Sequence, residues 1–192
     1  MSGFQLLRSG SVKKSGDGAL FASARAISSG CLDEMKLERG GLPIKSGADA
    51  EVRPNDVLVV LRGPVNAAAA IPRALSMPLF ATLELAIVRP HAALDAKYLA
   101  WLINQSSSQA ALAEMRLGGG VQRLPLAALE KLLLLPTPSL ETQRTIAAID
   151  DLAREEARLS DQLAALRTTR LRAALLAAAH TPQIERHAHA RS

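Results

Sequence analysis

The feature that most constrains the fold of this chain is a Pro-x-Pro segment next to a long, unbroken helical pattern. Pro136 and Pro138 cannot continue a helix or donate to a sheet ladder, so they separate the preceding residues from the helical pattern. Ser139 can accept a hydrogen bond from the free amides of a first helical turn, and Glu141 suits the positive end of the helix dipole. Because neither proline nor glycine interrupts the pattern, the sequence predicts one helix over 139–179.

One face of this predicted helix is apolar. A helix of about forty residues is roughly 60 Å long, which exceeds the width of a small domain, so much of it must pack on another helix or remain exposed. Its apolar residues recur at spacings of three and four over about three heptads, which favours a coiled-coil partner. The predicted dimerisation residues are Ile149, Leu152, Leu159, Leu163 and Leu166. The alternative is a long core helix or a solvent-exposed one.

The charges of the predicted helix indicate how it pairs. Six acidic and three basic residues lie over 141–161, whereas 162–179 holds only the bases Arg167, Arg170 and Arg172. An antiparallel second copy would place the acidic half of each helix beside the basic half of the other, so we expect an antiparallel homodimer. Exposed ion pairs contribute only about a few tenths of a kcal/mol each. The charges therefore set the orientation, and the apolar stripe supplies the affinity.

The composition is that of a folded protein. The chain has 192 residues, of which 48% are hydrophobic and 21% charged. Its single cysteine, Cys31, cannot form an internal disulfide and is expected to be a small buried residue. No signal-peptide pattern appears at the N-terminus, and no uncharged apolar run approaches the ~20 residues of a membrane helix. We therefore expect a cytoplasmic protein without a membrane segment.

The globular part of the chain is its basic part. The formal net charge is +5, and residues 1–138 carry fifteen bases against eleven acids, a difference of +4. An excess of this size is compatible with contact to nucleic-acid phosphates, but many proteins without such partners are equally basic.

Apolar runs and turn signals over 1–138 predict a mixed α+β fold, because strands and helices do not alternate strictly. The predicted strands are 4–7, 20–22, 57–61, 79–88 and 131–135, with 9–18 as a loop, a turn before 57–61 and an end after it at Gly63. Asp95 should cap one helix, and 106–108 should begin a second that closes at 118–120. The predicted organisation is a globular domain over 1–138, a spacer helix over 139–179 and a tail over 180–192.

No catalytic constellation is present in the sequence. The four histidines, His91, His180, His187 and His189, have no cysteine or acidic cluster at metal-ligand spacing. The nucleotide-binding and hydrolase glycine motifs are absent. The glycines at 118–120 are typical of helix termination and a loop after it, with a phosphate-cradling loop as the alternative. We therefore expect neither an enzyme nor a bound metal or cofactor.

Four motifs together resemble the specificity (S) subunit of type I restriction-modification systems. They are the strand motif at 55–63, the helix at 97–103, the glycine loop at 118–124 and the Pro-x-Pro segment at 135–146. Asn55 stands where the family usually has glycine, and Thr142 adds one residue to the family's Pro-x-Pro-x-x-Glu-Gln spacing. The order of the four motifs also matches that of the family.

The resemblance implies a DNA-recognition role without catalysis. S subunits of this family carry two recognition domains and two spacer helices, whereas this chain has one of each, so we expect a half subunit that pairs with a second copy. Each domain would read half of a split double-stranded DNA target, and the helix length would set the gap. The helices would dock the DNA methyltransferase subunits and, in a complete system, the restriction subunit.

The residues with suitable chemistry for DNA contact lie in or beside predicted loops. Arginine can bond guanine and glutamine adenine in the major groove, which points to Arg62, Gln122 and Arg123 as base-reading residues. Loop lysines suit phosphate contacts, which adds Lys13, Lys14 and Lys45. The alternative for each is an ordinary surface charge or, for Arg62, an ion pair with Asp56.

Two other functions are compatible with the sequence. One is a coiled-coil adaptor that binds only protein, with the basic domain as a scaffold. The other is a DNA-binding regulator that acts without a methyltransferase. Binding to duplex DNA that weakens steeply with salt and depends on the methyltransferase would exclude the adaptor, whereas the regulator would bind a specific duplex alone.

Overall fold

The computed structural model describes residues 3–8, 14–28, 30–42, 51–71, 76–134 and 137–180. The chain divides into two compact units, Met1–Ala148 and Ile149–Ser192. The first unit combines β-sheets with helices, and the described part of the second is entirely helical. The predicted α+β class is therefore confirmed.

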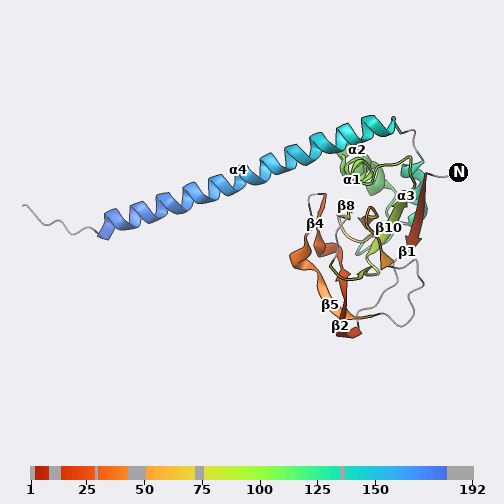
Figure 1. Cartoon of the computed structure of the whole chain (residues 1–192), viewed down its shortest axis with the longest axis horizontal. Helices are drawn as coiled ribbons and strands as arrows, with labels where there is room; N and C mark the ends of the chain where they lie inside the picture. The colour runs from red at the N-terminus through yellow and green to blue at the C-terminus, as the bar shows by residue number, and fades with distance from the viewer. Residues whose placement is uncertain are drawn as a thin grey trace, which may run out of the picture. The chain divides into compact units, whose positions relative to one another are not determined.

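One antiparallel sheet forms the centre of the first unit. Its strands, in spatial order, are β1 (Phe4–Arg8), β10 (Leu85–Pro90), β7 (Val57–Val60) and β8 (Ala68–Ala70). Three helices pack together near this sheet (Figure 1): α1 (Ala96–Asn104), α2 (Ser106–Glu114) and α3 (Leu126–Leu133). Alternate residues of β7 point to opposite faces, so Val57 and Val59 join the core with these helices, whereas Leu58 and Val60 join a second cluster.

A second sheet contributes to that other cluster. Its order is β5 (Glu38–Gly41), β2 (Lys14–Ala22), β9 (Leu79–Ala81) and β6 (Glu51–Val52), with β2 and β9 parallel. A small hairpin pairs β3 (Ile27–Ser28) with β4 (Cys31–Leu32), and two short 3-10 helices, η1 (Ala24–Ala26) and η2 (Glu34–Lys36), flank it. Cys31 is exposed on this hairpin, so the expectation that it is buried is wrong.

Several predicted elements differ from the structure. The run at 131–135 is not a strand, because its described part begins in α3, where Leu129, Leu132 and Leu133 share one buried helical face. Residues 79–88 form two strands, β9 and β10, because the chain turns at 82–84 and exposes Leu83. The predicted loop over 9–18 overlaps β2, which already begins at Lys14.

The helices after β10 agree better with their predictions. Asp95 caps α1 as predicted: its Oδ1 accepts hydrogen bonds from the backbone N–H groups of Lys97 at 2.9 Å and Tyr98 at 3.1 Å. The second helix exists, but it ends at Glu114, before the glycines, and Gln105 precedes it without a side-chain cap. Burial raises the pKa of the Tyr98 phenol on α1.

The strand motif at 55–63 has a structural explanation. Asn55 has φ = 68°, a left-handed conformation that glycine and asparagine adopt most readily. The adjacent Asp56 is buried and accepts bonds from Arg89 Nε at 2.9 Å and Nη2 at 2.8 Å. The backbone N–H of Arg53 donates to the same carboxylate at 2.7 Å. Asp56 therefore pairs with Arg89, and the alternative that Arg62 is its ion-pair partner is wrong.

The start of α4 (Leu140–His180) is fixed within the first unit. Ser139 Oγ accepts a bond from the backbone N–H of Thr142 at 3.2 Å, which confirms the predicted cap. Gln143 is 1% exposed, and its Oε1 accepts from the N–H of Asp95 at 2.8 Å. Its Nε2 donates to the carbonyl of Pro138 at 2.9 Å. The glutamine of the Pro-x-Pro segment thus ties the first turn of α4 to the cap of α1.

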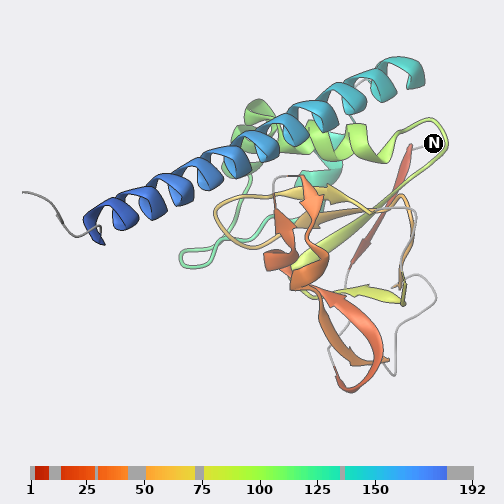
Figure 2. The same ribbon diagram turned by 60° about the vertical axis from the view of Figure 1, so that its left-hand side comes forward.

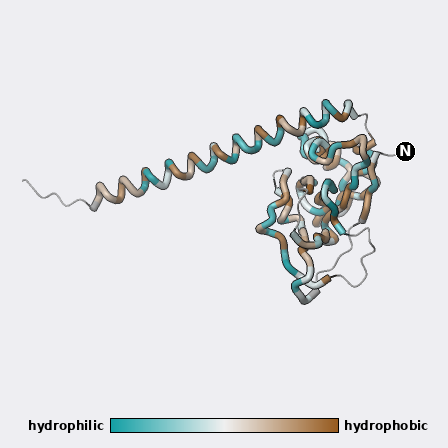
Figure 3. Tube along the Cα trace, viewed as in Figure 1, coloured by the Kyte–Doolittle hydropathy of each residue, from teal (hydrophilic) through white to brown (hydrophobic). Residues whose placement is uncertain are grey.

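The second unit contains the rest of α4, along which apolar and polar residues alternate (Figure 3). The predicted dimerisation residues are all solvent-exposed in this single chain, at 62% for Ile149, 71% for Leu152, 51% for Leu159, 48% for Leu163 and 63% for Leu166. Hydrogen bonding to Arg158 lowers the pKa of Glu155. Among the described residues, no helix has the length and apolarity needed to cross a membrane.

Candidate functional site

Two segments that are distant in sequence, 61–63 and the hairpin over 117–123 with Leu124 after it, meet in a small backbone ribbon. Leu117 and Arg123 exchange two N–H to carbonyl bonds of 2.9 Å, which closes a hairpin. The N–H of Gly63 donates to the carbonyl of Gln122 at 3.2 Å. The N–H of Leu124 donates to the carbonyl of Leu61 at 2.8 Å. The hairpin over 117–123 is the green loop in Figure 2, and it lies beside the gold segment after β7.

This ribbon places two arginines directly opposite one another. Arg62 and Arg123 are bridge partners, and both are exposed. Directly opposed residues have their Cβ atoms about 5 Å apart on the same face, and like charges in that position repel. Two of the three predicted base-reading residues are thus brought together across about sixty residues of sequence. Gln122 precedes Arg123 in the hairpin and is also exposed.

The two opposed arginines are not neutralised within the described part of the chain. Neither Arg62 nor Arg123 forms an ion pair with a described carboxylate, whereas Arg89, Arg154 and Arg158 do. A like-charge pair without a counter-ion weakens the local fold, and such local conflicts are expected where a protein binds a ligand. The ribbon therefore has the electrostatics of an anion-binding surface.

Glycine geometry allows the hairpin its sharp tip. Gly118 in the hairpin has φ = 112°, and Gly63 on the facing segment has φ = 121°, values that residues with side chains rarely adopt. A Cβ at Gly119 or Gly120 would meet open space. The glycines at 118–120 therefore do not close α2, as the sequence pattern had indicated, but form the end of an exposed hairpin.

Exposed apolar side chains accompany the arginines on these segments. Val65 is 55% exposed, Leu117 66% and Val121 77%. We call Arg62, Arg123 and these three residues, which are all exposed on or next to the segments of the ribbon, the hairpin surface. Together they offer both hydrogen-bond donors and apolar contacts. Such a combination suits base edges in a DNA groove, where arginine can bond guanine and an apolar group can contact the thymine methyl.

Of the three predicted phosphate-binding lysines, the structure places only the backbone of one. Lys14 begins β2, opposite Gly41 of β5, but its side chain is not among those described. Lys13 and Lys45 lie outside the described residues.

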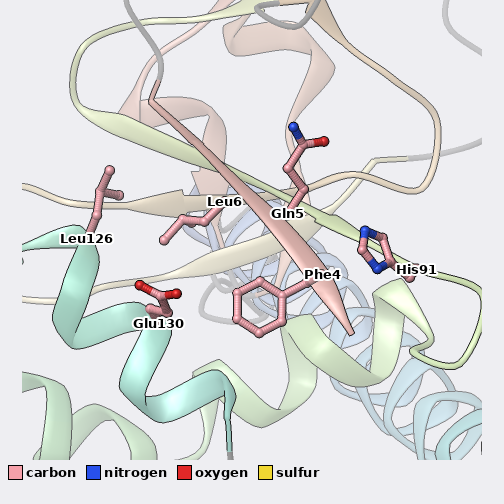
Figure 4. A pocket seen from close by; sticks show the side chains of 6 residues that line it. All are labelled: Phe4, Gln5, Leu6, His91, Leu126 and Glu130. Atoms are coloured by element: carbon pink, nitrogen blue, oxygen red, sulfur yellow. The ribbon is translucent and has the colours of Figure 1, made fainter. Parts of the chain in front are cut away.

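A hollow of about 570 Å³ lies beside the edge strand β1 and is shown in Figure 4. Its lining residues are Phe4, Gln5, Leu6, His91, Leu126 and Glu130. His91 and Glu130 lie on opposite sides of β1, so this hollow does not bring them together as an acid-base pair. The described residues also contain no group of three or more histidine, cysteine or acidic side chains placed to hold a metal.

Several solved structures have a fold similar to that of this chain. One match is the HsdS subunit from Thermoanaerobacter tengcongensis, with a TM-score of 0.61, 18% identity, and coverage of 99% of this chain and 51% of that one. A second is a protein from a structure of a type I R-M system, with a TM-score of 0.59, 19% identity, and coverage of 90% and 43%. A third is the type I restriction-modification S subunit from M. genitalium, with a TM-score of 0.50, 15% identity, and coverage of 87% and 40%.

The chain therefore has the fold of type I restriction-modification specificity subunits, as the sequence motifs led us to expect. It spans about half the length of these structures. No protein-family model matches the chain, and neither does any curated protein.

Proposed function

We propose that this chain is the DNA-recognition subunit of a type I restriction-modification complex, and that the hairpin surface contacts DNA bases. The observation that carries the proposal is the opposed pair Arg62 and Arg123, exposed and without a carboxylate partner among the described residues. The fold shared with S subunits supports the same function. The chain contributes recognition, and a partner DNA methyltransferase performs the chemistry in the cytoplasm. In a complete system a restriction subunit joins them.

We further propose that two copies act together. The exposed stripe of α4 pairs with that of a second copy in antiparallel orientation, and each copy reads one half of a split target. The exposed leucines of the stripe and its acidic and basic halves support this arrangement.

The test is binding of the full chain, alone and with its methyltransferase, to a library of randomised duplexes. We expect a selected half-site sequence and binding that weakens steeply with salt. Replacing Arg62 or Arg123 by alanine should reduce binding to the selected duplex roughly 5- to 150-fold, because one base contact contributes about 1–3 kcal/mol of discrimination.

Arg39→Ala is the matched control. Arg39 is an exposed arginine of the same unit, but it already pairs with Asp17 at 3.7 Å. Equal losses in Arg39→Ala and Arg123→Ala would contradict the assignment of the hairpin surface. A chain that binds the methyltransferase but no duplex at low salt would instead indicate a protein-protein adaptor.

A further inference from the structure

Arg116 is a third arginine beside the hairpin, and it is held in a different way from Arg62 and Arg123. It directly precedes Leu117, the residue that pairs with Arg123. Its side chain is half-buried, whereas the two opposed arginines are exposed. Its Nε donates a hydrogen bond of 2.9 Å to Oδ1 of Asn66. The guanidinium is therefore anchored at one edge to the interior of the unit.

The anchor itself cannot easily move. Asn66 is 0% exposed, and its Nδ2 donates to the carbonyl of Val60 at 2.8 Å. Its backbone N–H donates to Oε1 of Gln109 at 3.0 Å, and its backbone carbonyl accepts from Nε2 of Gln109 at 3.0 Å. Rotation of the Asn66 amide would break the bond to Val60 and the bond to Arg116. The network thus fixes the direction of the Arg116 side chain before any ligand arrives.

The two outer nitrogens of Arg116 remain available. A guanidinium has five N–H donors, of which Asn66 uses the one on Nε. No carboxylate in the described part of the chain forms an ion pair with Arg116, and its outer nitrogens have no hydrogen-bond partner there. A half-buried cation without a counter-charge is costly to the fold. An anionic ligand would supply that charge, and the outer edge of a guanidinium matches two oxygens of a phosphate.

We propose that Arg116 binds one backbone phosphate of the DNA beside the bases that the hairpin surface contacts. This inference rests on the proposed function and assigns phosphate contact to Arg116 and base contact to the exposed arginines. A recessed, anchored arginine cannot follow a base edge into a groove, so it suits the phosphates that lie at the outside of the duplex. The exposed arginines can reach into the groove. Asn66 is the positioning residue that orients Arg116.

The test is the salt dependence of binding between the full chain, with its methyltransferase present, and a duplex of about 30 base pairs with mixed sequence. Arg116→Ala should lower the slope of log K against log salt by about 0.9, the value for one lost phosphate contact. The half-site sequence selected from a randomised library should stay the same. Arg116→Lys should keep most of the slope, because it keeps the charge, but should weaken binding several-fold, because lysine cannot form the paired contact.

Lys97→Ala is the control for loss of one positive charge. Lys97 lies near the start of α1. The other end of α1, about 10 Å further along the helix, is the end near Asn66, because Asn104 there accepts a hydrogen bond from Ala68, two residues after Asn66. This variant should leave the slope unchanged. Thermal melts monitored by circular dichroism establish that each variant is folded at the binding temperature.

Three results would contradict the inference. An unchanged slope in folded Arg116→Ala would mean that Arg116 contacts no phosphate. A changed half-site sequence would mean that it reads a base. If the unmodified chain binds no duplex at low salt, either alone or with its methyltransferase, the proposed function fails and this inference fails with it, whereas the first two results leave DNA recognition intact.

Discussion

The two units of this chain differ in how they place their apolar residues. In the first unit, Leu58, Ile87 and Leu99 are at most 1% exposed, and the buried carboxylate of Asp56 is matched by Arg89. In the second unit, all five predicted dimerisation residues are 48–71% exposed. The first unit therefore has a buried core of its own, whereas the described helix of the second unit leaves a stripe of apolar side chains exposed.

The difference indicates where each part of the function lies. A unit with its own core can hold side chains in fixed positions, as the ribbon holds the proposed recognition residues Arg62 and Arg123. The proposed pairing would stabilise the exposed helix, so its association should depend on concentration and on the partner present. Mutations in the first unit should therefore change its stability, and mutations in the exposed stripe of α4 should change association.

The largest expected effect is on the first unit. Asp56→Ala should destabilise it by about 3–5 kcal/mol, because the mutation leaves Arg89 half-buried without its carboxylate. Urea unfolding monitored by tryptophan fluorescence measures this, since the single tryptophan, Trp101, lies in α1. Asp17→Ala, which breaks the exposed pair with Arg39, is the control and should cost no more than about 1 kcal/mol. Equal costs would mean that Asp56 is not part of the core.

The second effect is on association. Leu159→Asp combined with Leu166→Asp should convert the expected dimer into a monomer, because two charges would lie in the apolar stripe of each copy. Light scattering of the full chain measures the mass. The control is Ala157→Asp combined with Ala164→Asp, which adds the same charge at the same spacing on another face of α4. A double leucine variant that stays dimeric would place the interface elsewhere.

The smallest effect concerns the turn before β7. Asn55→Gly should leave the free energy of unfolding within about 1 kcal/mol, because glycine adopts positive φ without strain. Asn55→Val should cost about 1–3 kcal/mol, because a β-branched residue is strained there. The same urea experiment compares the two variants. Similar stabilities for glycine and valine would show that the conformation at Asn55 is not needed for the turn.

Sequence patterns predicted the structure best where interactions between neighbouring residues determine it. The caps at Asp95 and Ser139 were predictable because a short polar side chain at a helix start has few other roles. The buried run in β7 was predictable because it is continuous and β-branched. The run at 131–135 was misassigned because a short leucine run fits a strand or a helix equally well, and only its packing in α3 decides.

The candidate site was only partly predictable. The chemistry of Arg62 and Arg123 could be read from their residue types, but their pairing depends on tertiary contacts between segments sixty residues apart. Arg116 and Asn66 were missed. A signal for Asn66 existed, because it is the one polar residue within 65–71, an otherwise apolar segment. A polar residue in such a run is often buried and hydrogen-bonded, but its partners cannot be found without the structure.

In the proposed function, the helix α4 pairs with a second copy and thereby sets the distance between the two DNA-recognition units. Inserting four residues after Leu152 lengthens α4 by about 6 Å and rotates the rest of the helix by roughly one turn, so the stripe stays nearly in phase. With the partner methyltransferase present, methylated sites should keep both half-site sequences. Their gap should grow by nearly two base pairs for each copy, at about 3.4 Å per base pair. An unchanged gap, or altered half-site sequences, would contradict the account.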